Sequence, residues 1–419
     1  MPTLLPLSLR PLAAAALLCA GGAQAQETFK IAYIDPLSGP FANVGELMLN
    51  HIQFAVEDIN AKGGVNKVPL QLLQFDSKLS AQESQSALQA AIDQGARAII
   101  TGGSGSSVVT ALVQSAARHN QRNPGKEVMV LNHSSIDPEL TGKACNFWHF
   151  MFDANTAMRM KAISDYIKTE PSIQKVYLLN QDYAHGKQWA AYGRSMVGAA
   201  RPDIQFVGET LHPIGKVKDF APYVSKVKAS GADTIISGNW GQDMALLLKA
   251  AGDAGLDYRY FNHSAGGVPG TVLAVSQAGK GQLTWVAEWH PGQANRPAAD
   301  AQAKAYKAKM GKDFLSPRID ITVRFLAAAI QKSQSTDPLK VATAMENMVL
   351  DTSIGKVRMR GQDHQLLLPQ VVNTIAPVDG KRVTAGWEGT QWGFRTDAVI
   401  PAEQLTLDSA CQMKRPERL

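Results

Sequence analysis

Short apolar runs alternate with longer amphipathic stretches along most of this chain. The runs are rich in aliphatic and β-branched residues, as is typical of buried strands. They cover residues 30–34, 70–74, 98–101, 128–131, 176–179 and 234–237. Each run is followed by a stretch with helical spacing, such as 50–60 or 244–254. This alternation predicts βαβ units and doubly wound parallel sheets of the α/β class.

Ligands of such sheets bind beyond the carboxyl ends of the strands, so the loops after the strands are the expected site. Three of these loops, at 35–41, 102–107 and 132–135, combine small, hydroxyl and backbone-exposing residues. Serine hydroxyls and free N–H groups before a helix suit a carboxylate or a phosphate. Serine capping of a helix without any ligand is the alternative for the Gly/Ser loop.

Two more specific interpretations of the Gly/Ser loop fail. It lacks the Gly-Lys-Ser/Thr sequence of a nucleotide P-loop, and Val108 stands where a dinucleotide fingerprint has its third glycine. The chain has no Gly-x-Ser-x-Gly elbow. We can assemble neither an activated nucleophile nor an acid and base pair from sequence neighbours, so we do not expect an enzyme.

The first 25 residues have the pattern of an export signal. Arg10 is their one charged residue, residues 12–20 form an apolar run, and Ala23-Gln24-Ala25 matches a small-x-small cleavage site. A mature chain beginning at Gln26 in the periplasm is therefore expected. A lipid anchor at Cys19 is the alternative, but the bulky Leu18 precedes the cysteine where a lipoprotein signal has a small residue.

The composition of the mature chain is ordinary for an exported protein. Removing the signal leaves 419 − 25 = 394 residues, enough for two lobes. The net charge falls from +6 to +5 when Arg10 is removed. The sequence has no basic patch interleaved with aromatic residues, which is the pattern that would indicate nucleic-acid binding. Cys145 and Cys411 remain, and an even pair in an oxidising compartment predicts a disulfide, with two buried free thiols as the alternative. No CxxC, HExxH or Cys/His cluster indicates a metal site.

Seven blocks, in order, resemble the periplasmic leucine/isoleucine/valine-binding protein family. They are PLSGPFANVG, AVEDINAKGGV, GARAIITGGSGSS, SIDPELTG, NQDYAHGKQWA, DFAPYVSKVKASGADTIISGNW and MRGQDHQ. The resemblance covers nearly the whole mature chain. It implies a type I periplasmic binding protein, with two Rossmann-like lobes, each a doubly wound parallel sheet, joined by a three-crossover hinge. It also implies delivery of a small ligand to an inner-membrane ABC permease, with no cofactor, and we expect a monomer.

Three crossovers make each lobe discontinuous in sequence. The resemblance implies an N-lobe of residues 26–150 and 289–350, and a C-lobe of residues 151–288 and 351–400. Residues 401–419 would form a tail that returns to the N-lobe if Cys411 pairs with Cys145.

The resemblance also implies particular ligand contacts. Family members hold a ligand carboxylate in the third-strand and fourth-strand loops, which here offer Ser104, Ser106, Ser107, Ser134 and Ser135. Aromatic or flat side chains should cover the ligand's apolar body; they are Phe41, Tyr183, His185 and Trp240. A packing role is the alternative for each of these side chains.

One departure from the family changes the expected ligand. The amino-acid receptors pair the ligand ammonium with a glutamate, but Ala265 holds the matching position, and the second ammonium contact falls on Ile136 unless a one-residue shift brings Ser135 there. An unpaired buried ammonium costs several kcal/mol. We therefore expect a carboxylate without an α-amine, unless Asp243 or Asp182 supplies the missing charge.

Aromatic residues near the expected site favour an aromatic or other hydrophobic acid. An amino acid, urea or a short amide is the alternative ligand. A ligand-binding sensor that signals to a separate membrane partner is the alternative class, since it would use the same cleft.

Overall fold

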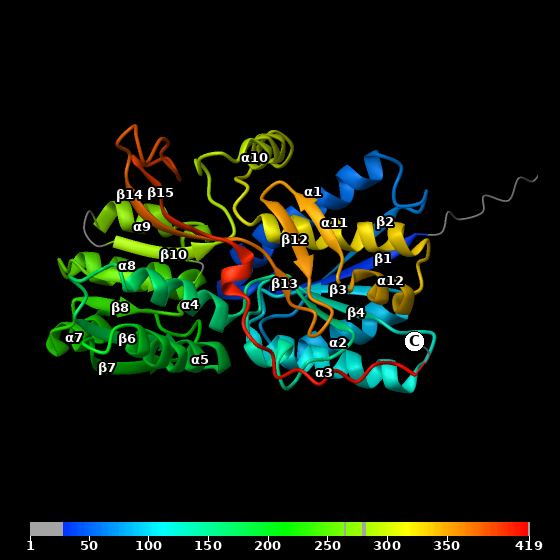
Figure 1. Cartoon of the computed structure of the whole chain (residues 1–419), viewed down its shortest axis with the longest axis horizontal. Coiled ribbons are helices and arrows are strands. Elements are labelled where there is room, and N and C mark those ends of the chain that lie inside the picture. The colour runs from blue at the N-terminus through cyan, green and yellow to red at the C-terminus, as the bar shows by residue number, and fades with distance from the viewer. Residues whose placement is uncertain (1–27, 264, 279–281, 418–419) are drawn as a thin grey trace, which may run out of the picture.

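The chain forms two α/β lobes that lie side by side along the long axis of the molecule (Figure 1). The computed structural model describes residues 28–263, 265–278 and 282–417. The predicted signal peptide and Cys19 lie outside these ranges. Within them, no helix combines the length and the apolar character needed to cross a membrane.

The first lobe is built on a five-stranded parallel sheet of order β2-β1-β3-β4-β5. Its strands are β1 (Phe29–Asp35), β2 (Leu70–Asp76), β3 (Ala98–Thr101), β4 (Met129–Asn132) and β5 (His149–Met151). Its helices are α1 (Ala42–Ala61), α2 (Ala81–Asp93), α3 (Ser106–Arg122), α10 (Pro297–Met310), α11 (Pro317–Ser333) and α12 (Pro338–Met345). Strands β3 and β4 are buried along their whole length, as expected for a parallel sheet covered on both faces.

The second lobe has a seven-stranded sheet of order β15-β14-β10-β9-β8-β6-β7. The parallel strands are β6 (Lys175–Gln181), β7 (Gln205–His212), β8 (Thr234–Ile236), β9 (Arg259–Asn262) and β10 (Gln282–Ala287). The antiparallel pair β14 (Gln370–Pro377) and β15 (Trp392–Ile400) extends this sheet beyond β10. Its helices are α4 (Thr156–Ile167), α5 (Ala184–Tyr192), α6 (Gly198–Ala200), α7 (Ala221–Ser230), α8 (Gly241–Asp253) and α9 (Thr271–Ala278).

A small antiparallel sheet is formed by the chain between β10 and β14. It consists of β11 (Val349–Thr352), β12 (Gly355–Met359) and β13 (Leu366–Leu367). A bridge between Met151 and Gln365 places it beside β5. Short helical turns complete the fold: η1 (Gly39–Phe41), η2 (Pro138–Thr141), η3 (Gly193–Val197), η4 (Ala265–Gly267) and η5 (Ala402–Leu405).

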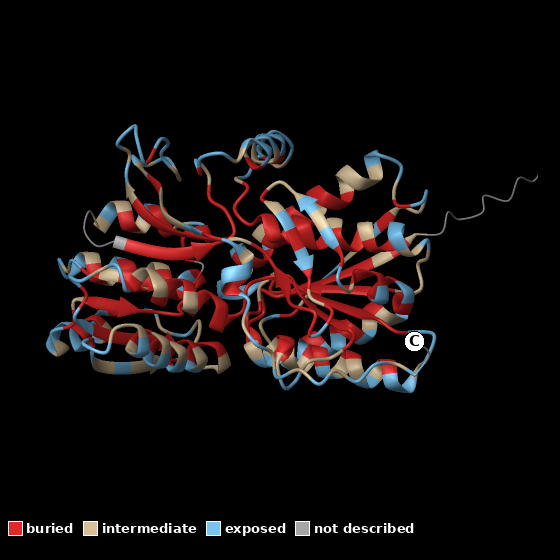
Figure 2. Cartoon of the chain, viewed as in Figure 1, coloured by how far each residue is buried: buried red, intermediate tan, exposed pale blue. Residues whose placement is uncertain are grey.

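Alternate residues of a strand pack into different hydrophobic cores, because successive side chains of a strand point to opposite faces of the sheet. In β1, Ile31 and Tyr33 face the helices α1 and α11, whereas Ala32 and Ile34 face α2 and α3. The strands form the most continuously buried part of the molecule (Figure 2). The predicted α/β class and the alternation of strands and helices are therefore confirmed, and each of the six predicted strand runs matches a strand to within two residues at either end.

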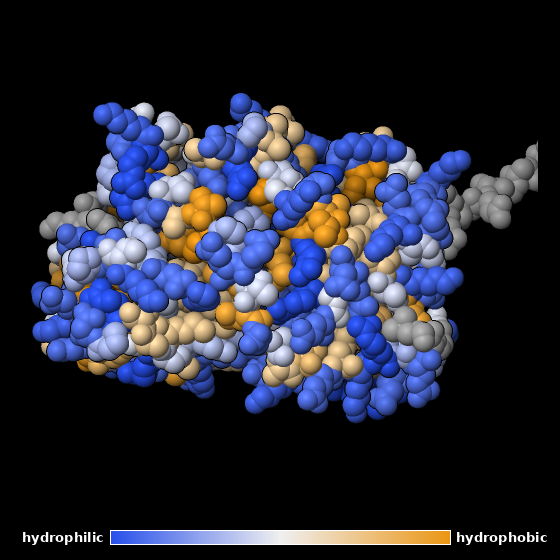
Figure 3. All heavy atoms as spheres, viewed as in Figure 1, coloured by the Kyte–Doolittle hydropathy of each residue, from blue (hydrophilic) through white to orange (hydrophobic). Residues whose placement is uncertain are grey.

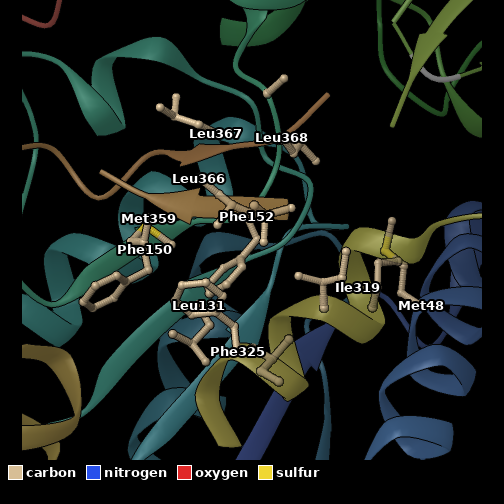
Figure 4. Close-up of a cluster of buried hydrophobic side chains, with 14 of the residues drawn as sticks. Met48, Leu131, Phe150, Phe152, Ile319, Phe325, Met359, Leu366, Leu367 and Leu368 are labelled. Carbon is tan, nitrogen blue, oxygen red and sulfur yellow. The ribbon is translucent and has the colours of Figure 1, made fainter. Parts of the chain in front are cut away.

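The chain passes between the lobes after β5, after β10 and again before β14. Near the first passage, Phe152 packs edge-on against Phe325 of α11, with ring centroids 5.5 Å apart. Figure 4 shows both rings beside Leu131, Phe150 and Leu366. The lobe boundaries implied by the resemblance stay predictions.

The predicted disulfide between Cys145 and Cys411 is confirmed, with an S–S distance of 2.03 Å. It ties the tail that follows β15 to the first lobe, which the tail reaches in Figure 1. Ser409 Oγ donates to the carbonyl of Thr141, and Arg415 pairs with Glu346 at 2.7 Å. The tail is therefore held by polar contacts as well as by the covalent bond.

The face of the molecule seen in Figure 3 is mainly hydrophilic, with apolar patches near its middle. Among the described residues, the large apolar side chains that are clearly exposed are Leu273, Val349 and Val399.

Candidate functional site

A cavity of about 60 Å³ lies where the two lobes meet, and both lobes contribute side chains to it. A buried water occupies about 10–15 Å³ on this measure, so the cavity has room for about four to six waters. That space corresponds to one small organic molecule. The cavity lies at the carboxyl ends of the parallel strands, where the fold class predicts a ligand.

The loop after β3 forms one wall of the cavity. Gly102, Gly103, Gly105 and Ser106 line it, and α3 begins at Ser106. Gly105 has a φ of +82°, and a Cβ there would lie 3.4 Å from the ring of Tyr183 in the other lobe. That distance is an ordinary van der Waals contact, so it is the positive φ that favours glycine here. The free N–H groups of the first turn of α3 are available to an anion.

The loop after β4 adds Ser134 and Ser135 to the same wall. The Asn132 side chain fixes this loop, since its Oδ1 accepts from Ser135 N at 2.8 Å and its Nδ2 donates to Ser135 O at 2.7 Å. Ser134 Oγ lies 3.0 Å from Arg318 Nη2 and 2.9 Å from His133 Nδ1. Ser135 Oγ is buried and has no hydrogen-bond partner among the described residues.

Aromatic side chains from the second lobe face these serines. Trp240 Nε1 donates to Tyr183 Oη at 2.8 Å, and both residues line the cavity. Burial raises the pKa of Tyr183, so its phenol stays protonated. Phe41 of the first lobe packs on Trp240 with ring centroids 4.4 Å apart. This contact joins the lobes at the cavity wall.

Two imidazoles lie next to these aromatic rings. His185 and His263 line the cavity with ring centroids 4.5 Å apart. Burial lowers the pKa of His185 to about 4, and burial lowers that of His263 well below its ordinary value. Both rings are therefore neutral at pH 7. His263 Nδ1 and Trp285 Nε1 have no hydrogen-bond partner within the described part of the chain.

Four buried charged residues form the remaining part of the cavity wall. Arg318 Nη1 lies 3.0 Å from Glu288 Oε1, and Arg318 Nε lies 3.0 Å from Asp153 Oδ2. Arg159 donates to Asp153 Oδ1 and to the carbonyls of His263 and Val286. Burial lowers the pKa of Arg318, but the charges of Asp153 and Glu288 raise it by more. Two guanidinium groups thus balance two carboxylates.

The structure brings six of the ten predicted site residues to the cavity, and these are Ser106, Ser134, Ser135, Tyr183, His185 and Trp240. Their roles as ligand contacts stay predictions. The other four lie elsewhere. Ser104 Oγ is bonded to Asp35 and Ser77, Ser107 is exposed, Phe41 lies behind Trp240, and Ala265 is buried in η4.

The two suggested substitutes for the family's glutamate also lie outside the cavity lining. Asp182 is half exposed and pairs with Lys187 at 2.9 Å. Asp243 is buried and accepts from Gln181 Nε2 at 2.7 Å and from Gly215 N at 2.9 Å. The sequence interpretation missed Asp153 and Glu288, which are the acidic side chains that do line the cavity.

Comparisons with known proteins agree with this architecture. Residues 28–376 match the family model described as "Periplasmic binding protein". The chain is 33% identical over 419 residues to "Leu/Ile/Val-binding protein homolog 4" of Brucella abortus, which covers 96% of this chain and 97% of that relative.

Two solved structures share the fold. The closed conformation of a "Leucine-, isoleucine-, valine-, threonine-, and alanine-binding protein" from Brucella ovis has a TM-score of 0.80 and 31% identity, covering 93% of this chain and all of that one. A solute-binding protein from R. palustris in complex with benzoate has a TM-score of 0.77 and 15% identity, covering 92% and 99% of the two chains.

Proposed function

Because the chain belongs to the periplasmic binding protein family, as a substrate-binding protein of a branched-chain-amino-acid type ABC transporter, we propose that it closes on a small hydrophobic or aromatic carboxylate without an α-amine. The family is one of solute receptors that work in the periplasm with a membrane permease. Export through the predicted signal at residues 1–25 and delivery of this acid to the permease are parts of the proposal.

The serine wall of the cavity, formed by Ser106, Ser134 and Ser135, supports a carboxylate at one end of the ligand. Ser106 stands at the start of α3, where free N–H groups and the helix dipole favour negative charge. Ser135 Oγ is a buried donor with no partner in the described structure, and a carboxylate oxygen would satisfy it. These groups need no charged partner to bind an anion.

The opposite wall supports an apolar body. Trp240, Tyr183 and Trp285 present ring surfaces, and Val268 and Met48 add aliphatic and thioether surface. Such rings can stack on a planar ligand and exclude water from it. The R. palustris neighbour, solved with benzoate, shows that this fold accommodates an aromatic acid.

One observation supports a ligand without an α-amine. Both acidic side chains of the cavity wall already pair with arginine. Asp153 contacts both Arg159 and Arg318, and Glu288 faces Arg318. An ammonium would have to compete with a guanidinium for either carboxylate. Because Asp153 and Glu288 nevertheless line the cavity, an α-amino acid is the second candidate ligand, with one of these carboxylates as its partner.

Matched ligands that differ only at the α-carbon test this proposal. The purified protein, refolded to remove carried-over ligand, would be screened by thermal shift against 3-phenylpropanoate and phenylalanine, and against 4-methylpentanoate and leucine. Urea and acetamide complete the panel. A ligand at 100 times its Kd adds about 2.7 kcal/mol to the free energy of unfolding. We expect the acids to raise the midpoint and the amino acids to bind at least about 100-fold more weakly.

Two variants locate the binding site. Ser106→Ala should weaken binding of the acid, whereas Ser115→Ala is a control on the same helix, since Ser115 Oγ donates to Ala111 O and lies outside the cavity. If leucine or phenylalanine binds and the matched acid does not, the ligand is an amino acid. If urea or acetamide alone binds, the carboxylate proposal is wrong.

A further inference from the structure

A chain of four polar groups leads from a buried carboxylate to the cavity. Asp35 Oδ2 lies 3.1 Å from His133 Nε2, His133 Nδ1 lies 2.9 Å from Ser134 Oγ, and Ser134 Oγ lies 3.0 Å from Arg318 Nη2. Asp35 and His133 are fully buried, whereas Ser134 is half-buried and lines the cavity. The order of donors and acceptors along this chain decides what Ser134 offers to a ligand.

The carboxylate end sets the direction of the first bond. Asp35 Oδ1 accepts from Gly102 N at 3.2 Å and from Ser104 Oγ at 2.9 Å. A carboxylate surrounded by donors in this way acts only as an acceptor. His133 must therefore donate to Asp35 through Nε2.

The arginine end sets the direction of the last bond. A guanidinium has donors only, so Arg318 Nη2 donates to Ser134 Oγ. If His133 were protonated on both nitrogens, Nδ1 would aim a second cationic donor at the same hydroxyl oxygen. A neutral ring that carries its proton on Nε2 leaves Nδ1 as an acceptor, and Ser134 then donates its one hydrogen to it.

We propose that His133 is held as the neutral Nε2–H tautomer, that Ser134 therefore offers the ligand an acceptor and no donor, and that the ligand is a hydroxy acid whose hydroxyl donates to Ser134 Oγ. The inference rests on the proposed carboxylate ligand and narrows its class. The hydroxyls of Ser135 and Ser106 have no hydrogen-bond partner among the described residues, so their hydrogens are not already donated to another group. They are the hydroxyls that can donate to the carboxylate.

The tautomer can be measured without any ligand. Long-range ¹H–¹⁵N correlation spectra of protein labelled at the ring nitrogens of its nine histidines separate the neutral tautomers from each other and from imidazolium. The His133 signals are those lost in His133→Gln, and the Ser134→Ala variant, which removes only the hydroxyl, identifies Nδ1 by its shift. At pH 7.5 we expect Nε2 protonated and Nδ1 bare. A proton on Nδ1, whether in the neutral Nδ1–H tautomer or in the imidazolium, would overturn the inference.

The ligand class is tested with acids that differ by one hydroxyl. 3-Phenyllactate would be compared with 3-phenylpropanoate, 2-hydroxy-4-methylpentanoate with 4-methylpentanoate, and 4-hydroxybenzoate with benzoate. In at least one pair the hydroxy acid should bind at least about fivefold more tightly, since an unmatched buried acceptor costs that much or more. Ser134→Ala should remove the difference, whereas Ser115→Ala should keep it.

The outcomes separate this inference from the proposed function. If acids bind but no pair favours the hydroxyl, or if Ser134→Ala preserves the preference, the hydroxy-acid inference is wrong while the carboxylate proposal stands. If no acid binds and an amino acid or amide does, the carboxylate proposal fails and the hydroxy-acid class fails with it, while the tautomer measurement still decides whether Ser134 is an acceptor.

Discussion

Arg318 on α11 and Asp153 after β5 form an ion pair in the wall of the cavity, with 3.0 Å between Nε and Oδ2. The same carboxylate accepts from Arg159 on α4, so it joins a helix of the first lobe to a helix of the second. All three side chains are at least nine-tenths buried. Asp153 is therefore a shared counterion at the junction of the lobes.

Replacing Asp153 with asparagine should strongly destabilise the protein. The substitution leaves two buried guanidinium groups with one carboxylate, and removing one partner of a buried ion pair costs about 3–5 kcal/mol. Urea denaturation measures this loss directly. Glu209→Gln is the control, because Glu209 pairs with Arg194 on the surface and such pairs contribute at most about 1 kcal/mol. Equal losses in the two variants would contradict the counterion role.

The contact between Phe41 and Trp240 should hold the ligand-free protein closed. The rings lie 4.4 Å apart and come from different lobes, and an aromatic pair contributes about 0.5–1.5 kcal/mol beyond its buried area. Trp240→Ala should shift the population toward the open form and raise the radius of gyration in small-angle X-ray scattering. Trp392→Phe, on β15, is the control. An unchanged radius in Trp240→Ala would show that this contact does not govern closure.

The sequence predicted the sheets because the signal for a strand is local. The runs at 98–101 and 128–131 contain enough aliphatic residues to identify β3 and the start of β4 without any partner. The loops that follow these strands are accordingly the expected site, and three of their serines, Ser106, Ser134 and Ser135, line the cavity. Hydrophobic pattern therefore predicted both the fold class and the serine wall.

The charged wall could not be predicted in the same way, because its members are far apart in sequence. Asp153 and Arg318 are separated by 165 positions, and Glu288 lies between them on another crossing of the lobes. No motif spacing connects such residues. One signal was available: Arg318 and Asp320 alternate with Ile319 and Ile321 at the start of α11, and a charge among buried apolar positions indicates a buried partner.

Acid should destabilise the folded protein at a pH where its carboxylates are still ionised. Burial lowers the pKa of His51, His185 and His290 to about 4 and that of His149 to about 3, against about 6.5 in the unfolded chain. Above pH 6.5 both states are neutral at these positions. As the pH falls from 6.5 toward 4, the unfolded state gains protons that the folded state does not, so stability is lost.

The expected slope is about 1.4 kcal/mol per pH unit for each such histidine. Urea denaturation between pH 7.5 and 5 measures it. His51→Gln tests one contribution, because His51 Nε2 accepts from Leu315 N and Ser316 N and cannot be protonated without breaking these bonds. This variant should have a smaller slope than the wild type between pH 6.5 and 5. A free energy of unfolding that stays constant over this range would contradict the prediction.

The disulfide should contribute to stability mainly because it closes a long loop. Cys145 and Cys411 are 266 positions apart, and the chain-entropy model gives about 5–6 kcal/mol for a loop of this length, from which strain in the folded state subtracts. The Cys145→Ser/Cys411→Ser double variant should lose up to this amount in urea denaturation, and its tail should become sensitive to limited proteolysis because only contacts such as Ser409 to Thr141 remain. Dithiothreitol should destabilise the wild type to a similar extent and leave the double variant unchanged. If the double variant instead matches the oxidised wild type in both stability and protection of the tail, the polar contacts alone hold the tail, and the covalent link is not what keeps it on the first lobe.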